Sequence, residues 1–203
     1  MWELVKAGGW LMLPLLLCSI FMLAISLERL IRLKRKSILP PQLMLHGDDN
    51  TQTVMDALHQ DADLKDSTLG RIFMAGERSR LQSPEYARAQ MEAVASEEIG
   101  YLEKNINFLG TLSAVAPLLG LLGTVLGIIE SFLILDLSAN SNPTLMIPGI
   151  SKALITTAVG MLIAIPALFA YRYFQRLVHE YIMQLEQQAT LFHAAHFYHK
   201  GQR

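Results

Sequence analysis

The sequence predicts an all-α integral membrane protein, and two observations carry that prediction. Hydrophobic residues make up 52% of the 203 residues and charged residues only 17%, which is too apolar for an ordinary water-soluble domain. The charges are also segregated, because residues 7–27, 105–129 and 153–171 contain no Asp, Glu, Lys or Arg. Each run has about the 20 residues that a helix needs to cross a bilayer core. We therefore expect three transmembrane helices.

The first apolar run predicts a retained membrane anchor. It lacks a cleavage site of small residues, and it is followed by the charged stretch ERLIRLKRK. Within it lies Cys18, the only cysteine of the chain, so no internal disulfide and no cysteine-based metal site are expected. We expect Cys18 to be a small apolar residue of a membrane helix.

The distribution of basic residues predicts the orientation in the membrane. Only Lys6 and Lys152 flank the membrane on one side. The other side carries eight basic residues: Arg29, Arg32, Lys34, Arg35, Lys36, Lys104, Arg172 and Arg176. Because cytoplasmic flanks are the richer in Lys and Arg, we expect the N-terminus in the periplasm and the C-terminus in the cytoplasm.

The second and third membrane helices are expected to be long. Ser83, Pro84 and Glu85 form a helix start, with a capping serine, a proline at the first position and an early acid. From there we expect one helix to about Leu135, and the third run to continue past Tyr171, so that both extend into the cytoplasm. The expected segments are 1–36 (first membrane helix with its basic end), 37–107 (cytoplasmic, helical), 108–135 (second membrane helix), 136–149 (periplasmic loop), 150–172 (third membrane helix) and 173–203 (cytoplasmic helix and tail).

Small and hydroxyl-bearing residues form one stripe on each of the last two membrane helices. They recur every three or four residues: Ser113, Pro117, Gly120, Thr124, Gly127 and Ser131 in one run, and Ala153, Thr157, Gly160, Ala164 and Ala167 in the other. One interpretation is close helix packing, since small residues let backbones approach. The other is a polar path, because a threonine hydroxyl can hydrogen-bond a buried carboxyl in either protonation state.

The three runs lack the group that such a path would need. Transfer of protons or ions through a membrane normally uses ionisable side chains at depth, and none of the runs has one. Another chain must supply it. No nucleophile–base pair, phosphate loop or metal quartet appears, so we expect no enzyme and no cofactor. A nucleic-acid binder would normally show a basic face, whereas the net charge of this chain is -1, so we expect no nucleic-acid binding. His193, His196 and His199 have a spacing that could bind a metal, but on a terminal tail we expect none.

Three stretches carry a family resemblance: MWELVKAGGWLMLPLLLCSI, APLLGLLGTVLGIIESF and GISKALITTAVGMLIAIPALFAYRYF. They resemble the MotA/TolQ/ExbB proton channel family, and within it the ExbB/TolQ branch. The resemblance implies a homopentamer whose second and third helices line a pore. In that pore lies a dimer of single-pass partners of the ExbD/TolR kind, each with one proton-carrying aspartate. Thr124 and Thr157 match the family's pore threonines; the expected lining adds Gly120, Gly127, Gly160, Ala164, Ser131 and Pro117.

One position departs from the family pattern. Some relatives have glutamate where this sequence has Lys152, in GISKAL. Lys152 could reach water at the bilayer edge, or pair with an acid of the partner or of a neighbouring subunit. Glu130 is a second charge at the expected outer mouth, where it could attract cations or simply be solvated.

The resemblance predicts an ExbB-like subunit of a motor in the bacterial inner membrane. Driven by the proton-motive force, such a motor energises TonB-dependent transport across the outer membrane. A TolQ-like subunit that works with a TolA-like protein in the Tol-Pal envelope system is the alternative. A non-conducting membrane scaffold is a hypothesis of a different class.

Overall fold

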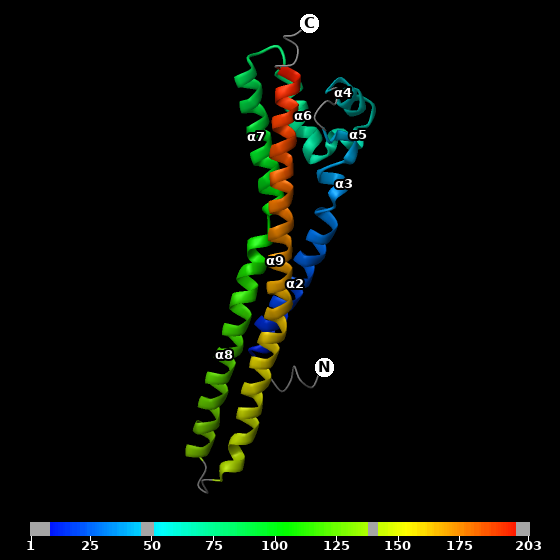
Figure 1. Ribbon diagram of the computed structural model, residues 1–203. Coiled ribbons are helices and arrows are strands. Elements are labelled where there is room, and N and C mark those ends of the chain that lie inside the picture. Colours follow the sequence, from blue (N-terminus) through cyan, green and yellow to red (C-terminus); the bar gives the residue numbers. More distant parts are fainter. Residues whose placement is uncertain (1–8, 46–50, 138–141, 198–203) are drawn as a thin grey trace. The chain divides into compact units, whose positions relative to one another are not determined.

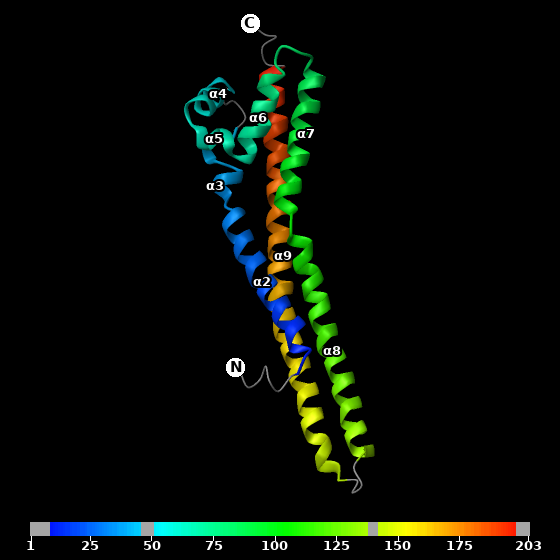
Figure 2. The ribbon, with the colours of Figure 1, turned by 180° about the vertical axis from the view of Figure 1, so that it is seen from behind.

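The computed structural model describes residues 9–45, 51–137 and 142–197, and the regular elements in these ranges are all helices (Figures 1 and 2). The chain divides into two compact units. The first comprises Met1–Glu28 and Asn105–Tyr173, and the second Arg29–Lys104 and Phe174–Arg203. Helices α2 (Met12–Arg32) and α9 (Ile147–Phe197) contribute residues to both units.

The first unit contains the apolar helices. It consists of most of α2, helix α8 (Ile106–Leu137), the short 3-10 helix η2 (Pro143–Met146) and the first part of α9. Helix α8 and this part of α9 lie side by side (Figures 1 and 2). Among the residues that the structure describes, three helical stretches are long and apolar enough to cross a membrane, and they lie in Met12–Arg32, Pro84–Asp136 and Pro143–Phe197. The expected membrane segments 108–135 and 150–172 lie inside α8 and α9.

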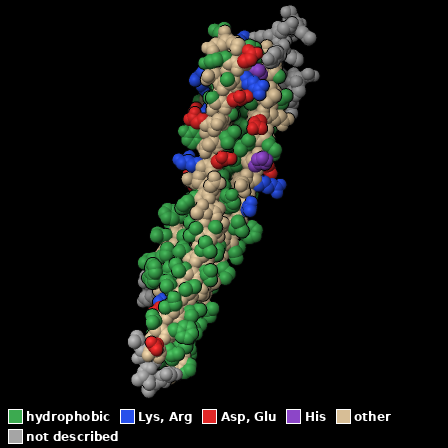
Figure 3. All heavy atoms as spheres, turned by 90° about the vertical axis from the view of Figure 1, so that its left-hand side faces the viewer, with side chains coloured by type: hydrophobic (Ala, Val, Ile, Leu, Met, Phe, Trp, Pro, Cys, Tyr) green, Lys and Arg blue, Asp and Glu red, His purple; other side chains and the backbone are tan. Residues whose placement is uncertain are grey.

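The interior of the first unit is small, and its exterior is apolar. A buried cluster joins the three helices through Met12, Leu15, Ala116, Ile163 and Ala164. Hydrophobic side chains also cover the face of this unit seen in Figure 3. Exposed examples are Leu13, Ile20, Leu118, Leu121, Phe132, Leu154, Leu162 and Phe169. Soluble monomers rarely expose apolar surface on this scale, whereas a membrane protein must.

The second unit is built from shorter, polar helices and the last part of α9. In chain order they are α3 (Arg35–Ile38), η1 (Pro41–Leu43), α4 (Thr51–Gln60), α5 (Ala62–Asp66), α6 (Thr68–Arg78) and α7 (Pro84–Glu103). The expected helix start at Ser83 is confirmed, because its hydroxyl accepts a hydrogen bond from the Tyr86 amide and Pro84 is the first helical residue. Ser67 caps α6 in the same way.

An aromatic core holds α6, α7 and α9 together in the second unit. Phe73 of α6 stacks on Phe192 of α9 with ring centroids 4.3 Å apart. Gly76 lets α6 approach α7 closely, since a Cβ at this position would lie 2.8 Å from Sδ of Met91 in α7. The 51-residue helix α9 confirms that the third apolar run continues past Tyr171.

The structure corrects the expectation of one uninterrupted helix from Pro84 to Leu135. Helix α7 ends at Glu103 and α8 begins at Ile106. Between them Asn105 has a φ of 62°, in the left-handed region that Asn tolerates better than most residues. The guanidinium of Arg29 donates from Nη1 to the carbonyls of Tyr101 and Leu102, at 3.1 and 3.2 Å. The last-turn carbonyls of α7 thus gain a buried, cationic donor.

Candidate functional site

Glycines set the close contact between α8 and α9 in the first unit. A Cβ on Gly160 would lie 2.7 Å from the carbonyl oxygen of Ala116, and one on Gly127 would lie 2.8 Å from Cβ of Ala153. Gly120 is similarly close to Thr157, with 3.1 Å to its Cα. A side chain at these positions would push the helices apart. These contacts within one chain support the interpretation of the small residues as sites of close helix packing.

The two threonines expected to line a pore use their hydroxyl hydrogens in different ways. Thr157 Oγ1 donates across the helix pair to the carbonyl of Gly120, at 2.9 Å. Thr124 Oγ1 donates to its own helix, to the carbonyl of Leu121 at 2.6 Å. Both residues are half-buried. A hydroxyl oxygen that donates a hydrogen bond still accepts one, so each can accept a hydrogen bond from a neutral carboxyl.

The structure adds Thr156, which the sequence analysis missed. It is buried, and its Oγ1 lies 2.8 Å from the carbonyl of Ala153 and 3.2 Å from that of Lys152. Its side chain faces Gly123 of α8, where a Cβ would collide with it. The signal was present in the sequence, because position 156 continues the three- and four-residue steps from Ala153 to Gly160.

The remaining expected lining residues have identifiable places. Ser131 is buried, with Oγ 2.8 Å from the carbonyl of Gly127 and 3.2 Å from that of Met146. Ala164 belongs to the buried cluster, and Pro117 is half-buried inside α8. Pore lining by these residues and by the glycines stays a prediction, since a pore would form only between several copies of the chain.

Glu130 and Lys152 form an ion pair, with Oε2 of Glu130 2.7 Å from Nζ of Lys152. From the sequence, the partner expected for Lys152 is water or an acid of another chain, whereas the structure pairs it with an acid of the same chain. The reason is the antiparallel packing, which puts Gly127 beside Ala153 and so brings the charge one turn later on α8 to the start of α9.

The ion pair borders a cavity of about 270 Å³. Helix α8 contributes one wall and α9 another, while residues that precede α2 close it. The full lining is Trp10, Leu11, Gly123, Leu126, Gly127, Glu130, Lys152 and Thr156. A cavity of this size has room for several water molecules, because one needs only about 10–15 Å³.

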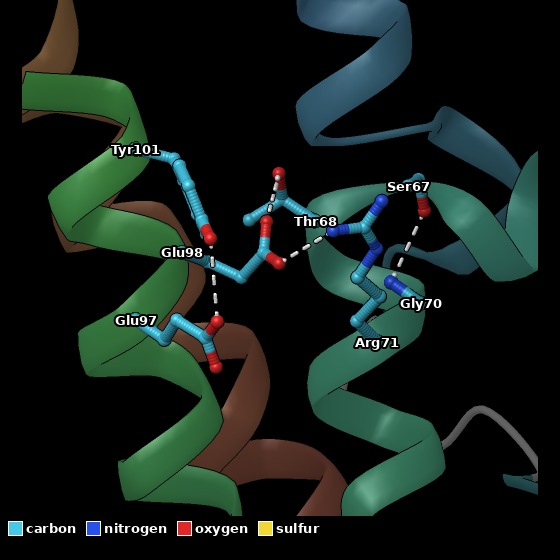
Figure 4. A network of polar contacts seen from close by, with 7 residues as sticks. All are labelled: Ser67, Thr68, Gly70, Arg71, Glu97, Glu98 and Tyr101. Atoms are coloured by element: carbon cyan, nitrogen blue, oxygen red, sulfur yellow. Dashed lines mark hydrogen bonds and ion pairs between the residues drawn. The ribbon is translucent and has the colours of Figure 1, made fainter. Parts of the chain in front are cut away.

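A buried glutamate organises the second unit (Figure 4). Glu98 of α7 accepts hydrogen bonds from Arg71 Nη1 at 2.8 Å and Thr68 Oγ1 at 3.3 Å, both from α6. Its neighbour Glu97 is exposed, and Tyr101 Oη lies 3.5 Å from its Oε1. Glu98 falls on the buried spacing between Met91 and Leu102, which is the sequence signal that it is paired.

The histidines of the HAAHFYH stretch have separate partners. His193 Nε2 lies 2.8 Å from the carbonyl of Pro84, and His196 Nε2 lies 2.8 Å from Oε2 of Glu77. His199 lies outside the described residues, as does Lys6. In the part of the chain that the structure describes, no three His, Cys, Asp or Glu side chains are grouped to hold a metal ion.

Comparison with known proteins places these features in a family. Residues 64–187 match the model of the MotA/TolQ/ExbB proton channel family. The chain is 37% identical over 176 residues to the biopolymer transport protein ExbB-like 1 of Synechocystis, a match that covers 81% of this chain and 66% of that protein.

Two further relatives match over shorter stretches. The Tol-Pal system protein TolQ of Pseudomonas aeruginosa is 41% identical over 121 residues, which are 54% of this chain and 52% of that protein. The biopolymer transport protein ExbB of Salmonella typhimurium is 38% identical over 81 residues, 40% and 33% of the two chains. The matches thus span from one third to two thirds of these relatives. The family model alone covers more than half of the chain, and this protein therefore belongs to the MotA/TolQ/ExbB proton channel family.

Proposed function

We propose that this protein is an ExbB-like subunit of a motor driven by the proton-motive force in the bacterial inner membrane. The observation that carries the proposal is the α8–α9 pair, in which two membrane-length helices keep hydroxyls at Thr124, Thr156 and Thr157 among apolar residues. Membership of a proton channel family supports conduction along this pair. The motor would energise TonB-dependent transport across the outer membrane.

The proposal requires a second chain to carry the titrating group. Residues 105–129 and 153–171 contain no Asp or Glu, so the level of the threonines has no carboxyl of its own. A single-pass partner of the ExbD or TolR kind, with one membrane aspartate, would supply it. A partner dimer would lie inside a homopentamer of this chain, where the threonine oxygens can accept from the protonated aspartate and their hydroxyls can donate to the ionised one.

We further infer the orientation and the reach of the helices. The excess of basic residues after α2 and along α9 favours a cytoplasmic C-terminus and a periplasmic N-terminus. Helix α7 and the last part of α9 would then extend into the cytoplasm, where their charged and hydrogen-bonded surfaces are stable in water. The loop between α8 and α9 would face the periplasm.

Proton flux into liposomes tests the proposal directly. The purified chain alone should conduct few or no protons, because its own membrane spans offer no carboxyl at the depth of the threonines. Addition of the partner should permit flux, and an aspartate-to-asparagine change in the partner should stop it. Strong flux from this chain alone would contradict the mechanism.

Two other functions have specific observations in their favour. The 41% identity to a Tol-Pal system protein TolQ supports a TolQ-like subunit whose partner is TolA-like. Co-purification distinguishes the two, since a TonB-like protein should accompany one complex and a TolA-like protein the other. The glycine contacts of α8 and α9 support a non-conducting scaffold, in which small residues only pack helices. A complex with its partner that assembles but conducts nothing would favour the scaffold.

A further inference from the structure

We propose that Glu130 is the cation-accepting carboxylate of a water-filled cavity at the loop end of the α8–α9 pair, and that Lys152 positions it. This inference rests on the proposed function, because it assigns the cavity as the route by which protons reach the threonines. The sequence left open whether Glu130 attracts cations or is simply solvated, and the cavity favours the first.

The first argument is the length of the cavity along α8. Its wall runs from Glu130 to Gly123, seven residues or about 10 Å of helix. Gly123 precedes Thr124, and Thr156 on the opposite wall precedes Thr157. The cavity therefore extends from the charged pair to the level of the threonines that would face the partner's aspartate.

The second argument is the composition of the wall. Glu130, Lys152 and Thr156 supply polar atoms, and the two glycines add no side chains that would fill the space. Water in a cavity needs about two to four polar partners, and this wall can provide them. A cavity lined by leucine alone would stay dry.

The third argument is how the ion pair is held. Lys152 is the less exposed member, with 30% of its side chain accessible against 51% for Glu130. Its side chain passes Gly9, where a Cβ would lie 2.9 Å from Nζ and would collide with the end of the aliphatic stem. Gly9 also has a φ of 70°, which disfavours any larger residue. Lys152 is thus half-buried against Gly9, while the carboxylate is the more accessible of the two charges.

The proton balance follows from this arrangement. A proton transferred from water to Oε2 of Glu130 neutralises the carboxylate and breaks its ion pair with Lys152, which keeps its charge. That proton then passes to a cavity water, and through it to the partner's aspartate. Release restores the carboxylate and the ion pair. Lys152 thus positions the ionised carboxylate of Glu130 at the cavity wall.

Thiol labelling tests the cavity without any need for flux. In a Cys18→Ser background, Leu126→Cys places a thiol in the cavity wall and Leu145→Cys places one in the exposed helix η2. Cationic and anionic methanethiosulfonates of similar size are compared at each site. We expect the cationic-to-anionic rate ratio at position 126 to exceed that at 145, because the carboxylate is the more exposed member of the ion pair, with 51% of its side chain accessible against 30% for Lys152.

The matched variants decide what causes this preference. Glu130→Gln should remove it, whereas Asp136→Asn, an exposed acid farther along α8, should leave it unchanged. A cavity thiol that does not react, or a preference that survives Glu130→Gln, would overturn the inference.

Flux through the complex with its partner tests the proton step. Glu130→Gln should lower flux by about tenfold or more, as expected for loss of a positioned proton-transfer group, while Glu130→Asp should retain a substantial part. Lys152→Gln should lower flux, whereas Lys152→Arg should keep it, because arginine retains the positive charge. If Lys152 made only an apolar contact, the two variants would not differ in this way. Flux at the wild-type level from an assembled Glu130→Gln complex would overturn the inference. If the wild-type complex itself conducts no protons, the proposed function is overturned, and the thiol labelling alone then tests the cavity.

Discussion

At the scale of single residues, Thr157 connects helices α8 and α9, the two helices proposed to line the pore. Its hydroxyl donates to the carbonyl of Gly120 in the structure and would have to serve the partner's carboxyl as well. A hydroxyl that donates can still accept, so Thr157 can bind the neutral carboxyl while it keeps this bond, but to donate to the ionised carboxylate it must give up the bond to Gly120. Thr124 bonds only within its own turn in the single chain, which makes its hydroxyl the easier one to redirect.

Valine substitution should separate the hydroxyl from the shape of the side chain. We expect Thr124→Val and Thr157→Val to impair proton-coupled activity while assembly stays normal, since each leaves a buried carboxyl short of a hydrogen bond worth about 1–3 kcal/mol. Leu121→Val, on an exposed apolar face of α8, is the control and should be mild. Full activity of the double valine variant in a flux or growth assay would exclude the threonine role.

Gly160 should be intolerant of even one methyl group. Its added Cβ would lie 2.7 Å from the carbonyl oxygen of Ala116, so Gly160→Ala must separate the helices and should lower stability by about 1–3 kcal/mol. Gly100 offers the matched control, because nothing lies within 4 Å of a Cβ built there. Gly100→Ala in helix α7 should be neutral or stabilising by up to about 1 kcal/mol. Unfolding of the two detergent-solubilised variants measures the difference, and equal stabilities would contradict the packing argument.

At the scale of elements, a single carboxylate joins α6 to α7. Glu98→Gln keeps the size of the side chain but removes the charge that Arg71 Nη1 binds, and we expect a loss of about 1 kcal/mol. The value is low for a charged hydrogen bond because 51% of the Arg71 side chain is exposed, so water screens the pair. The adjacent, exposed Glu97→Gln should change stability by less than about 0.5 kcal/mol. Chemical denaturation of the two variants tests this prediction, and a larger loss of stability for Glu97→Gln than for Glu98→Gln would contradict it.

At the scale of the whole molecule, topology is the first property to test. In a Cys18→Ser background, Leu81→Cys has a thiol on a residue that is 99% exposed, and Leu145→Cys has one near the α8–α9 loop. With the C-terminus cytoplasmic, an impermeant reagent outside the inner membrane should label position 145 and leave position 81 unmodified until the membrane is opened. Ready labelling at 81 in intact spheroplasts would reverse the orientation.

Assembly is the second property at this scale. The apolar faces of α2, α8 and α9 exceed what their mutual contacts bury, and the proposed pore needs several copies around it. We expect native mass spectrometry in mild detergent to show a ring, with five subunits as the family resemblance implies. A monomer that still supports function would contradict the pore.

The sequence by itself determined the class, the three apolar helices and the family. These depend on composition and on a spacing of three or four residues, both of which are local properties of the chain. Ser83 at the start of α7 and the long extension of α9 were predictable for the same reason. The stripe of small residues was also readable, although the choice between packing and pore lining was not, because either needs the same residue types.

Only the tertiary structure decided which residues meet. Glu130 and Lys152 are 22 positions apart, and their 2.7 Å ion pair depends on the register between α8 and α9, which glycine contacts set. The pairing of Glu98 with Arg71 likewise needs the packing of two helices. The break at Asn105 is not marked by a proline, and the last-turn carbonyls of α7 before it accept hydrogen bonds from Arg29, a residue distant in the sequence. Periodicity assigns a residue to a face of its own helix, but the partner of that face is chosen by the register and approach of another helix, which are properties of the folded chain.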